Sequence, residues 1–465
     1  MCKQTAAVLL LRFFAYIGNL RGCVPLWSYI KETLMSNIRD YLEAHKQEMI
    51  DLLGALVAIP SVQGKAEEGA PFGKEPAEAL SLMLDKCREF GFTVDNVENY
   101  AGSADVNDLP AGLAVLTHLD VVPVGAGWTT DPFVLRHEPD TDKLVGRGAI
   151  DDKGPAVAAL FAARAVRELG LPLKKGIRLI FGTNEENGSA DMEYYRKHRE
   201  LPPMVFTPDG EYPVINAEKG MLRVWFSSDF DDDEILDIQA GTVINAVPQF
   251  CTVTMENDEG EPEEAVYEGV SAHASTPEKG ENAITMFLDS YCGENLLIQS
   301  LGELFPHGEF SGKSCGLGFR DELSGDMTCV LSMLNTENGR ICGAVDIRFP
   351  LDRTKSEISG IICDALEGAG FTVDSCEGVE PHCTDENSEF VQGLLRVYER
   401  VTGDKAHCIA IGGGTYVHDI EGGVAFGAEF PNEDGRMHSP DEFITVANLL
   451  KNAEIMAEAM AELCG

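Results

Sequence analysis

Apolar positions in the first half of the chain alternate between helical spacing and short continuous runs. At residues 38–56 they recur every three or four residues, as in an amphipathic helix, and Pro60 ends this pattern. Further helical patterns cover residues 76–90 and 155–169. Short apolar runs are typical of strands buried on both faces of a parallel sheet, and they cover residues 112–117, 177–181 and 204–207.

This order of strands and helices predicts an α/β domain with a mostly parallel sheet. In such sheets, functional side chains gather beyond the carboxyl ends of the strands. Polar residues directly follow the three predicted strands: His118 follows the first, Glu185 and Glu186 the second, and Asp209 the third. We therefore expect these four side chains to lie along one edge of the sheet.

The pattern changes after about Glu218, where half-exposed strands and helices are mixed. Strands are expected at residues 221–226, 251–255 and 340–349, and helical stretches near residues 282–301 and 357–366. This segment predicts an inserted α+β domain. The α/β pattern returns from roughly Glu386, with helices at residues 390–401 and 446–463.

The predicted organisation has one α/β domain in two parts, with the insert between them. An N-terminal extension of unknown role covers residues 1–34, the two α/β parts cover 35–217 and 386–465, and the insert covers 218–385. Two domains also suit the length, because 465 residues are too many for one ordinary core.

Composition limits the classes of partner. The chain has 44% hydrophobic and 24% charged residues, and its 36 basic and 77 acidic residues give a formal net charge of −41. A polyanionic surface repels phosphate backbones and anionic membranes, so we expect neither nucleic acid nor a membrane as a partner.

The cysteines and the N-terminal segment bear on the cellular compartment. The 13 cysteines are scattered without a CxxC pair, which does not support a zinc ribbon and suits free thiols in a reducing cytosol. Residues 6–17 faintly resemble a signal peptide, but Arg12 interrupts the apolar run and no clear cleavage site follows. We expect a cytoplasmic protein whose fold begins near Met35.

One stretch, GRGAIDDKGP at residues 146–155, carries two adjacent acids among glycines between a strand pattern and a helix pattern. Alone it is more typical of a surface turn with a helix-capping aspartate. Our interpretation is that Asp151 bridges two metal ions and that four other ligands reach it from distant segments.

The polar residues after the strands allow metal chemistry. Residues two apart on a strand point to the same side, so the Asp120 carboxylate can bond one nitrogen of His118 and leave the other for a metal. Adjacent acids such as Glu185 and Glu186 repel each other unless a cation neutralises one. The simplest assignment of roles makes Glu186 a metal ligand and Glu185 the general base for a metal-bound water.

Each of these signals also has a structural explanation. His118 can be a satisfied histidine at a strand end, and the two glutamates can be a solvated pair capping the next helix. Asp209 lies in a Pro-Asp-Gly sequence that is strong turn chemistry, and His438 before the last helix is weak evidence alone.

Seven motifs together resemble the M20 metallopeptidase family, and within it bacterial dipeptidases of the PepV type. In chain order they are HLDVVP (118–123), GRGAIDDKGP (146–155), GTNEENG (182–188), TPDGEYP (207–213), GVSAHAS (269–275), GGGTY (412–416) and MHSPDE (437–442). The resemblance runs from about Met35 to the C-terminus.

The resemblance implies a site for two divalent metal ions, normally zinc, with a cis peptide bond between Asp151 and Asp152. An oxygen-rich ligand set also admits manganese or cobalt. The implied roles are His118 and Asp209 as ligands of one metal, Glu186 and His438 as ligands of the other, Asp151 as the bridge, Asp120 as the residue that orients His118, and Glu185 as the base.

The resemblance further implies that the insert is a lid. His273 would polarise the scissile carbonyl and stabilise the oxyanion. Asn245 and Arg348 would bind substrate, and the bidentate fork of Arg348 suits a C-terminal carboxylate, although a solvent-facing strand residue is the alternative. Gly413, Gly414 and Thr415 would hold the same carboxylate. At residues 417–419, Val-His-Asp departs from the basic residue expected there, so side-chain specificity is not implied.

The expected function is metal-dependent hydrolysis of short unblocked peptides, chiefly dipeptides, by a protein expected to be a monomer rather than a homodimer. One alternative is an N-acyl amino acid deacylase of the acetylornithine or succinyl-diaminopimelate type, against which the large insert argues. The other is a catalytically inactive metal- or peptide-binding protein, against which the presence of Glu185 and all five ligand candidates argues.

Overall fold

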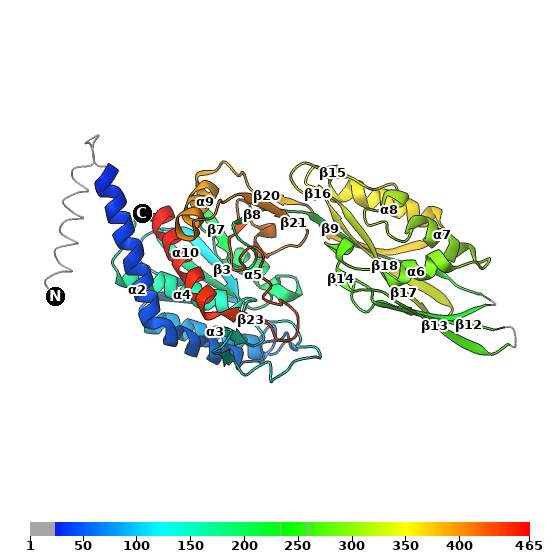
Figure 1. Cartoon of the computed structure of the whole chain (residues 1–465), viewed down its shortest axis with the longest axis horizontal. Coiled ribbons are helices and arrows are strands. Elements are labelled where there is room, and N and C mark those ends of the chain that lie inside the picture. Colours follow the sequence, from blue (N-terminus) through cyan, green and yellow to red (C-terminus); the bar gives the residue numbers. More distant parts are fainter. Residues whose placement is uncertain (1–23, 233, 258–259) are drawn as a thin grey trace.

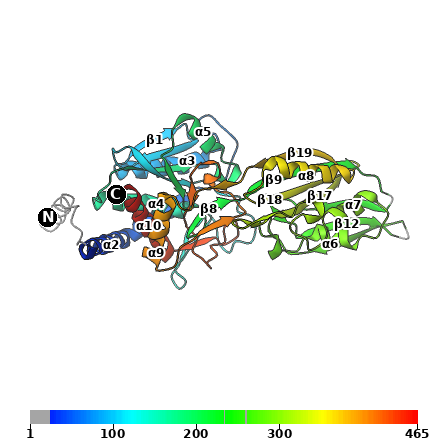
Figure 2. The ribbon, with the colours of Figure 1, turned by 90° about the horizontal axis from the view of Figure 1, so that it is seen from above.

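Two β-sheets, each with its own apolar core, organise the chain in a computed structural model that describes residues 24–232, 234–257 and 260–465. The sheets lie in two lobes placed side by side along the long axis of the molecule (Figure 1 and Figure 2). Of the expected N-terminal extension, residues 1–23 lie outside the described residues. Helix α2 (Val24–Val57) begins well before the predicted start near Met35.

The sheet of the first lobe is mixed, with a parallel centre. In the order β1-β2-β6-β3-β7-β22-β8-β20, the pairs from β6 to β22 are parallel, and β21 lies parallel beside β8. Both edges carry antiparallel pairs. The strands are β1 (Thr93–Val97), β2 (Ala101–Asp105), β3 (Ala111–His118), β6 (Gly176–Gly182), β7 (Met204–Thr207), β8 (Val214–Glu218), β20 (His382–Cys383), β21 (Cys408–Ile411) and β22 (Val424–Ala425).

Alternate residues of β3 enter different cores, which explains why its sequence is a continuous apolar run. Leu113 and Val115 pack in the core that also contains the buried sides of the helices on one face of the sheet. Ala114 and Leu116 pack on the other face. The prediction of a doubly covered strand is therefore confirmed. The helices of the first face are α2, α3 (Lys74–Glu89), α4 (Lys153–Glu168), α9 (Glu389–Thr402) and α10 (Val446–Cys464), and α5 (Ala190–His198) lies on the second.

Strand β2 is absent from the sequence prediction because its residues are mostly small. A side-chain carbon placed on Gly102 would lie 2.8 Å from a methyl group of Leu84 in α3. The small residues allow the helix to approach the strand closely, and they also remove the apolar signal by which strands are recognised. A separate small sheet contains β23 (Phe443–Thr445), β5 (Lys143–Val145) and β4 (Arg136–Glu138).

The second lobe has a seven-stranded antiparallel sheet in the order β13-β12-β10-β17-β18-β9-β19. Its core is shared with α6, α7 and α8, so this lobe is the α+β insert expected from the sequence. The elements are β9 (Gly220–Asp229), β10 (Ile235–Ala240), β12 (Phe250–Glu256), β13 (Pro262–Glu268), β17 (Thr328–Glu337), β18 (Arg340–Phe349), β19 (Thr372–Val379), α6 (Ala283–Ser290), α7 (Leu296–Leu304) and α8 (Lys355–Gly368).

The helical stretch expected near residues 282–301 is two helices. Asn282 and Asn295 each accept hydrogen bonds from two amides of the following turn through the side-chain oxygen, and thereby cap the starts of α6 and α7. A second cap in the middle of an apolar stretch marks a helix start that apolar spacing alone does not reveal.

The chain crosses between the lobes twice, at neighbouring positions. It leaves the first sheet at the end of β8 and enters the second at β9. It returns between β19 and β20, and β20 pairs with β8 although it lies within the residues assigned to the insert. Among the described residues, no helix is long and apolar enough to cross a membrane.

Replacing a buried leucine should show how strongly the first lobe depends on α4. Leu160 is completely buried in the core of the first lobe. Because Leu160→Ala leaves a cavity, we expect the free energy of unfolding to fall by about 2–5 kcal/mol, measured by urea denaturation with circular dichroism. Val134→Ala, at a residue that is 60% exposed, is the control. Equal urea midpoints for the two variants would contradict the predicted role.

Candidate metal centre and substrate cleft

The residues predicted to bind metal meet at the carboxyl edge of the parallel strands. His118 ends β3, and Asp209 follows β7 by two residues. Glu186 follows β6 in the short 3-10 helix η1 (Glu185–Asn187). Asp151 lies in the loop before α4, and His438 lies in the loop before β23. The ends of β3, β6 and β7 therefore supply side chains to one point, as parallel strands do, and two loops supply the other two.

Asp151 lies between two groups of candidate ligands. Its Oδ1 atom is 3.0 Å from Nε2 of His118, and that same nitrogen is 3.6 Å from Asp209. On the other side, Nε2 of His438 is 2.8 Å from Oδ2 of Asp151 and 3.1 Å from Glu186. A carboxylate with one oxygen toward each group has the arrangement required of a bridging ligand.

Two overlapping sets of side chains could each hold a metal ion, because their ligand atoms all lie within 4.8 Å of one another. One set is His118, Asp151 and Glu186, and the other is His118, Asp209 and Glu185. Glu185, predicted as the base, thus lies as close to the centre as a ligand would. The peptide bond between Asp151 and Asp152 is cis, as the resemblance implied.

The electrostatics of this cluster fit bound cations. Burial and the charge of Asp151 raise the pKa of Glu186 to about 7, and raise that of Asp209 to about 6. Burial and the charge of Asp209 hold the pKa of Glu185 well above its usual value. The Oε1 atom of Glu186 is buried without a hydrogen-bond partner among the described residues. A divalent cation would neutralise these carboxylates and use this oxygen, so the residues fit the expected metals.

Asp120 contacts both His118 and the acidic pair. Nδ1 of His118 is 3.0 Å from the main-chain oxygen of Asp120 and 3.5 Å from its carboxylate. The two carboxylate oxygens accept hydrogen bonds from the amides of Glu185 and Glu186, both at 3.1 Å. The carboxylate therefore positions the acidic pair, while the main chain of the same residue fixes His118.

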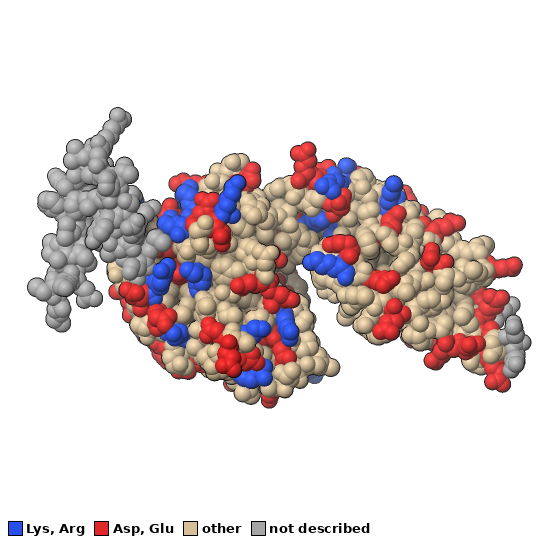
Figure 3. Space-filling model, viewed as in Figure 1, with Lys and Arg blue, Asp and Glu red and all other residues tan. Residues whose placement is uncertain are grey.

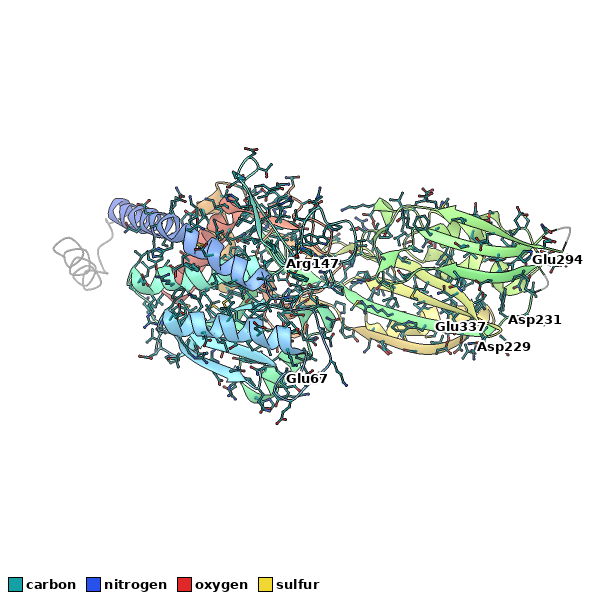
Figure 4. The ribbon with its side chains drawn as sticks, turned by 90° about the horizontal axis from the view of Figure 1, so that it is seen from below. Glu67, Arg147, Asp229, Asp231, Glu294 and Glu337 are labelled. Atoms are coloured by element: carbon teal, nitrogen blue, oxygen red, sulfur yellow. The ribbon has the colours of Figure 1, made fainter. Side chains whose placement is uncertain are left out.

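A buried ion pair, absent from the sequence prediction, supports the bridging residue. Nη1 of Arg147 donates to Glu442 over 2.7 Å, and both side chains are buried. The other oxygen of Glu442 accepts from the amides of Ile150 at 3.0 Å and Asp151 at 3.2 Å. Because Glu442 shares a loop with His438, this pair joins two ligand loops. Figure 4 places Arg147 within the first lobe, toward the second.

The candidate centre opens into a cleft of about 770 Å³ between the lobes. The hollow separating the lobes is visible in Figure 3. Its lining contains the predicted residues from both sides: Glu185, Glu186, His438, Gly413, Gly414 and Thr415 from the first lobe, and Asn245, His273 and Arg348 from the second. Residues far apart in the sequence are thus brought to one space.

His273 is arranged as a hydrogen-bond donor toward this cleft. Its Nδ1 atom accepts from the amide of Ser275 at 3.2 Å and lies 2.6 Å from the Ser275 hydroxyl. An accepting Nδ1 leaves the proton of a neutral imidazole on Nε2. Burial, followed by the charge of Arg348, lowers the pKa of His273 and favours the neutral ring.

Two predicted carboxylate-binding groups already have partners. The fork of Arg348 donates to Asp346 over 2.6 and 3.1 Å, and its Nη1 donates to the carbonyl of Gly412 at 2.9 Å. The hydroxyl of Thr415 donates to Glu218 over 2.9 Å. In contrast, the amides of Gly413 and Gly414 form no hydrogen bond with any described residue. These amides and the remaining N–H groups of Arg348 are therefore the donors left for a ligand.

Comparison with known proteins identifies the family. A sequence model described as "Peptidase family M20/M25/M40" matches residues 114–462. The Beta-Ala-Xaa dipeptidase of Lactobacillus delbrueckii subsp. lactis is 34% identical, and the alignment covers 92% of this chain and 98% of the relative. This chain belongs to peptidase family M20. The M20 family is one of metallopeptidases, so the protein is an enzyme of that class.

Further M20 relatives agree with this assignment. The putative dipeptidase YtjP of Bacillus subtilis is 32% identical over 90% of this chain and 97% of its own. Human carnosine dipeptidase 1 has the same fold, with a TM-score of 0.61 at 17% identity over 92% of this chain and 99% of its own. The Bacillus subtilis YXEP protein, described as a dinuclear metal binding peptidase, has a TM-score of 0.53 at 12% identity over 90% and 98%.

The role assigned to Glu442 can be measured directly. Glu442→Gln keeps the shape of the side chain but leaves Arg147 buried without its charge partner, which should lower the free energy of unfolding by about 3–5 kcal/mol. The main chain at Asp151 also loses part of its support, so zinc affinity should fall. Urea denaturation and calorimetric zinc titration measure the two effects. Glu421→Gln, at an exposed position, is the control. Wild-type values in both measurements would refute the role.

Proposed function

We propose that this M20 peptidase is a dipeptidase that hydrolyses short unblocked peptides in the cleft between its lobes. The supporting observation is that the candidate metal ligands, Glu185 and the second-lobe residue His273 belong to one space. The second lobe serves as the lid that contributes substrate-binding groups. The curated relatives named dipeptidases favour this substrate class over acylated amino acids.

In this proposal, the centre takes two divalent ions. His118 and Asp209 would hold one, Glu186 and His438 would hold the other, and Asp151 would be shared between them. Zinc is the proposed metal, with manganese or cobalt as alternatives suited to the same donors. When bound, such ions lower the pKa of coordinated water and polarise the scissile carbonyl.

Glu185 is the proposed general base. Its carboxylate lies within 4.8 Å of the ligand atoms of His118 and Asp209, so it would be close enough to take a proton from a water held at this centre. Burial raises its pKa, which suits a group that first takes a proton and then delivers it to the leaving amine. The Asp120 carboxylate, through the two amides it binds, keeps Glu185 in place.

The groups across the cleft are proposed to bind the rest of the substrate. Nε2 of His273 donates to the carbonyl oxygen as negative charge develops on it. Asn245 lies beside this histidine, since its neighbour Ala246 pairs with His273. The amides of Gly413 and Gly414, with Arg348, receive the C-terminal carboxylate, and Thr415 supports that turn. We further propose that the enzyme acts as a cytoplasmic monomer.

A substrate panel tests the proposal. Protein first depleted of metal and then loaded with zinc or manganese is given Ala-Ala, N-acetyl-Ala-Ala and N-acetylornithine, and free amine release is followed. We expect cleavage of Ala-Ala alone, and only after metal is added. Preference for N-acetylornithine would support a deacylase instead. Tight metal binding without cleavage of any of the three would support an inactive binding protein.

The role of Glu185 gives a separate prediction. Glu185→Gln retains an oxygen and the size of the side chain but removes the group that accepts the proton. We expect kcat for Ala-Ala to fall by about 10²–10⁴-fold while two metal ions remain bound per chain, measured by elemental analysis. Glu193→Gln, at an exposed acid on the cleft wall, is the matched control. Substantial activity in Glu185→Gln would eliminate it as the base.

A further inference from the structure

His418 lies where the chain crosses between the lobes. It belongs to the short 3-10 helix η4 (Tyr416–Asp419), directly after the glycine turn of the cleft. One crossing begins at Glu218, the last residue of β8. The other returns through Glu380, just after β19. His418 contacts both of these residues.

The partners of His418 require both ring nitrogens to donate. Nδ1 is 2.7 Å from the carboxylate of Glu218, and Nε2 is 2.8 Å from the main-chain oxygen of Glu380. A carboxylate and a carbonyl can only accept, whereas a neutral imidazole has one N–H. With Glu218 ionised, both hydrogen bonds therefore form only when the ring is a doubly protonated imidazolium. Burial alone would lower the pKa of His418, but the hydrogen bond to Glu218 and the charge of Glu218 raise it. The raised pKa favours the same imidazolium form.

The contact continues from Glu218 into the substrate cleft. The carboxylate of Glu218, which is 1% exposed, accepts from the hydroxyl of Thr415 at 2.9 Å and from its amide at 3.3 Å. A side-chain carbon on Gly414 would lie 3.5 Å from Nδ1 of His418 and 3.7 Å from Glu218. The turn that presents the free amides of Gly413 and Gly414 thus rests on the His418–Glu218 pair.

We infer that His418 is a positioning residue whose imidazolium joins the two crossings between the lobes and, through Glu218, sets the glycine turn that receives the substrate carboxylate. This inference rests on the proposed dipeptidase function.

The charged and titratable neighbours of His418 determine the direction of its pH dependence. Glu218 of β8 and Asp419 of η4 both favour the charged ring. The ring of His382 in β20 lies 6.3 Å away between centroids. Because the pKa is raised in the folded protein, the contact is complete at lower pH and is lost as pH rises through that pKa. Substrate affinity should fall over the same range.

Variants that differ in permanent charge test this inference. His418→Arg keeps two donors and a charge that does not titrate, whereas His418→Phe keeps a ring without donors. For Ala-Ala, we expect His418→Phe to raise KM about tenfold with little change in kcat, and His418→Arg to keep KM near the wild-type value. His407→Arg, at an exposed histidine lining a different groove, is the control.

The pH dependence of KM distinguishes a positioning role of His418 from a merely structural one, which would not change with the protonation of the ring. KM is measured against pH for the wild type and for His418→Arg, and the two values are divided at each pH. Titration of the substrate and of the metal centre affects both proteins alike and cancels in this ratio. We expect this ratio to rise with pH as His418 loses a proton. A flat ratio, or a KM in His418→Phe equal to that of the wild type, would overturn the inference.

A measurement without substrate separates this inference from the proposed function. Nitrogen-15 NMR of histidine-labelled metal-loaded protein, with His418→Arg identifying the signal, should show both ring nitrogens protonated at neutral pH. If Ala-Ala is not cleaved but the imidazolium is present, the dipeptidase proposal fails and the contact stands. A neutral ring would overturn the inference whatever the activity.

Discussion

Repulsion among buried carboxylates is the constraint on which the rest of the structure depends. Asp151, Glu185, Glu186 and Asp209 lie at one sheet edge. Burial and the neighbouring acids raise the pKa of Glu185, Glu186 and Asp209, whereas His118 and His438 lower the pKa of Asp151. The parallel strands β6 and β7 bring Glu185, Glu186 and Asp209 together, because the carboxyl ends of neighbouring parallel strands lie along one edge of the sheet. The surrounding contacts can be understood as the means by which the fold holds these acids in place for cations.

The contacts that hold the buried acids in place are made mostly by main-chain amides and less by oppositely charged side chains. Asp120 binds the amides of the two glutamates, and Glu442 binds the amides before and at the bridging aspartate. An amide fixes the direction of the backbone without neutralising the side chain that follows it. The acids are thus held in place without an opposite charge beside each of them, which leaves their oxygens available as candidate metal ligands.

The sequence predicted the parallel centre of the first sheet because β3, β6 and β7 are buried on both faces and read as apolar runs. It did not reveal β2, whose small residues pack beneath α3. For the site, short motifs identified the residues that the structure brings together: His118, Glu186 and Asp209 lie at or shortly after strand ends, whereas Asp151 and His438 lie in loops. Their partners could not be predicted in the same way. The contact of Arg147 with Glu442 joins residues 295 positions apart, which no local pattern reveals. In contrast, the bond from Arg348 to Asp346 follows from the strand itself, because residues two apart on one strand point to the same side.

The two crossings also bear on how such a protein can change over evolutionary time. The segment between them begins and ends at adjacent points, since β8 pairs with β20 on one side and β9 with β19 on the other. Its core shares no residues with the core of the first lobe. A lineage can therefore lengthen, shorten or replace the whole insert as one module, and acquire a new substrate preference, without disturbing the order of strands that assembles the metal centre.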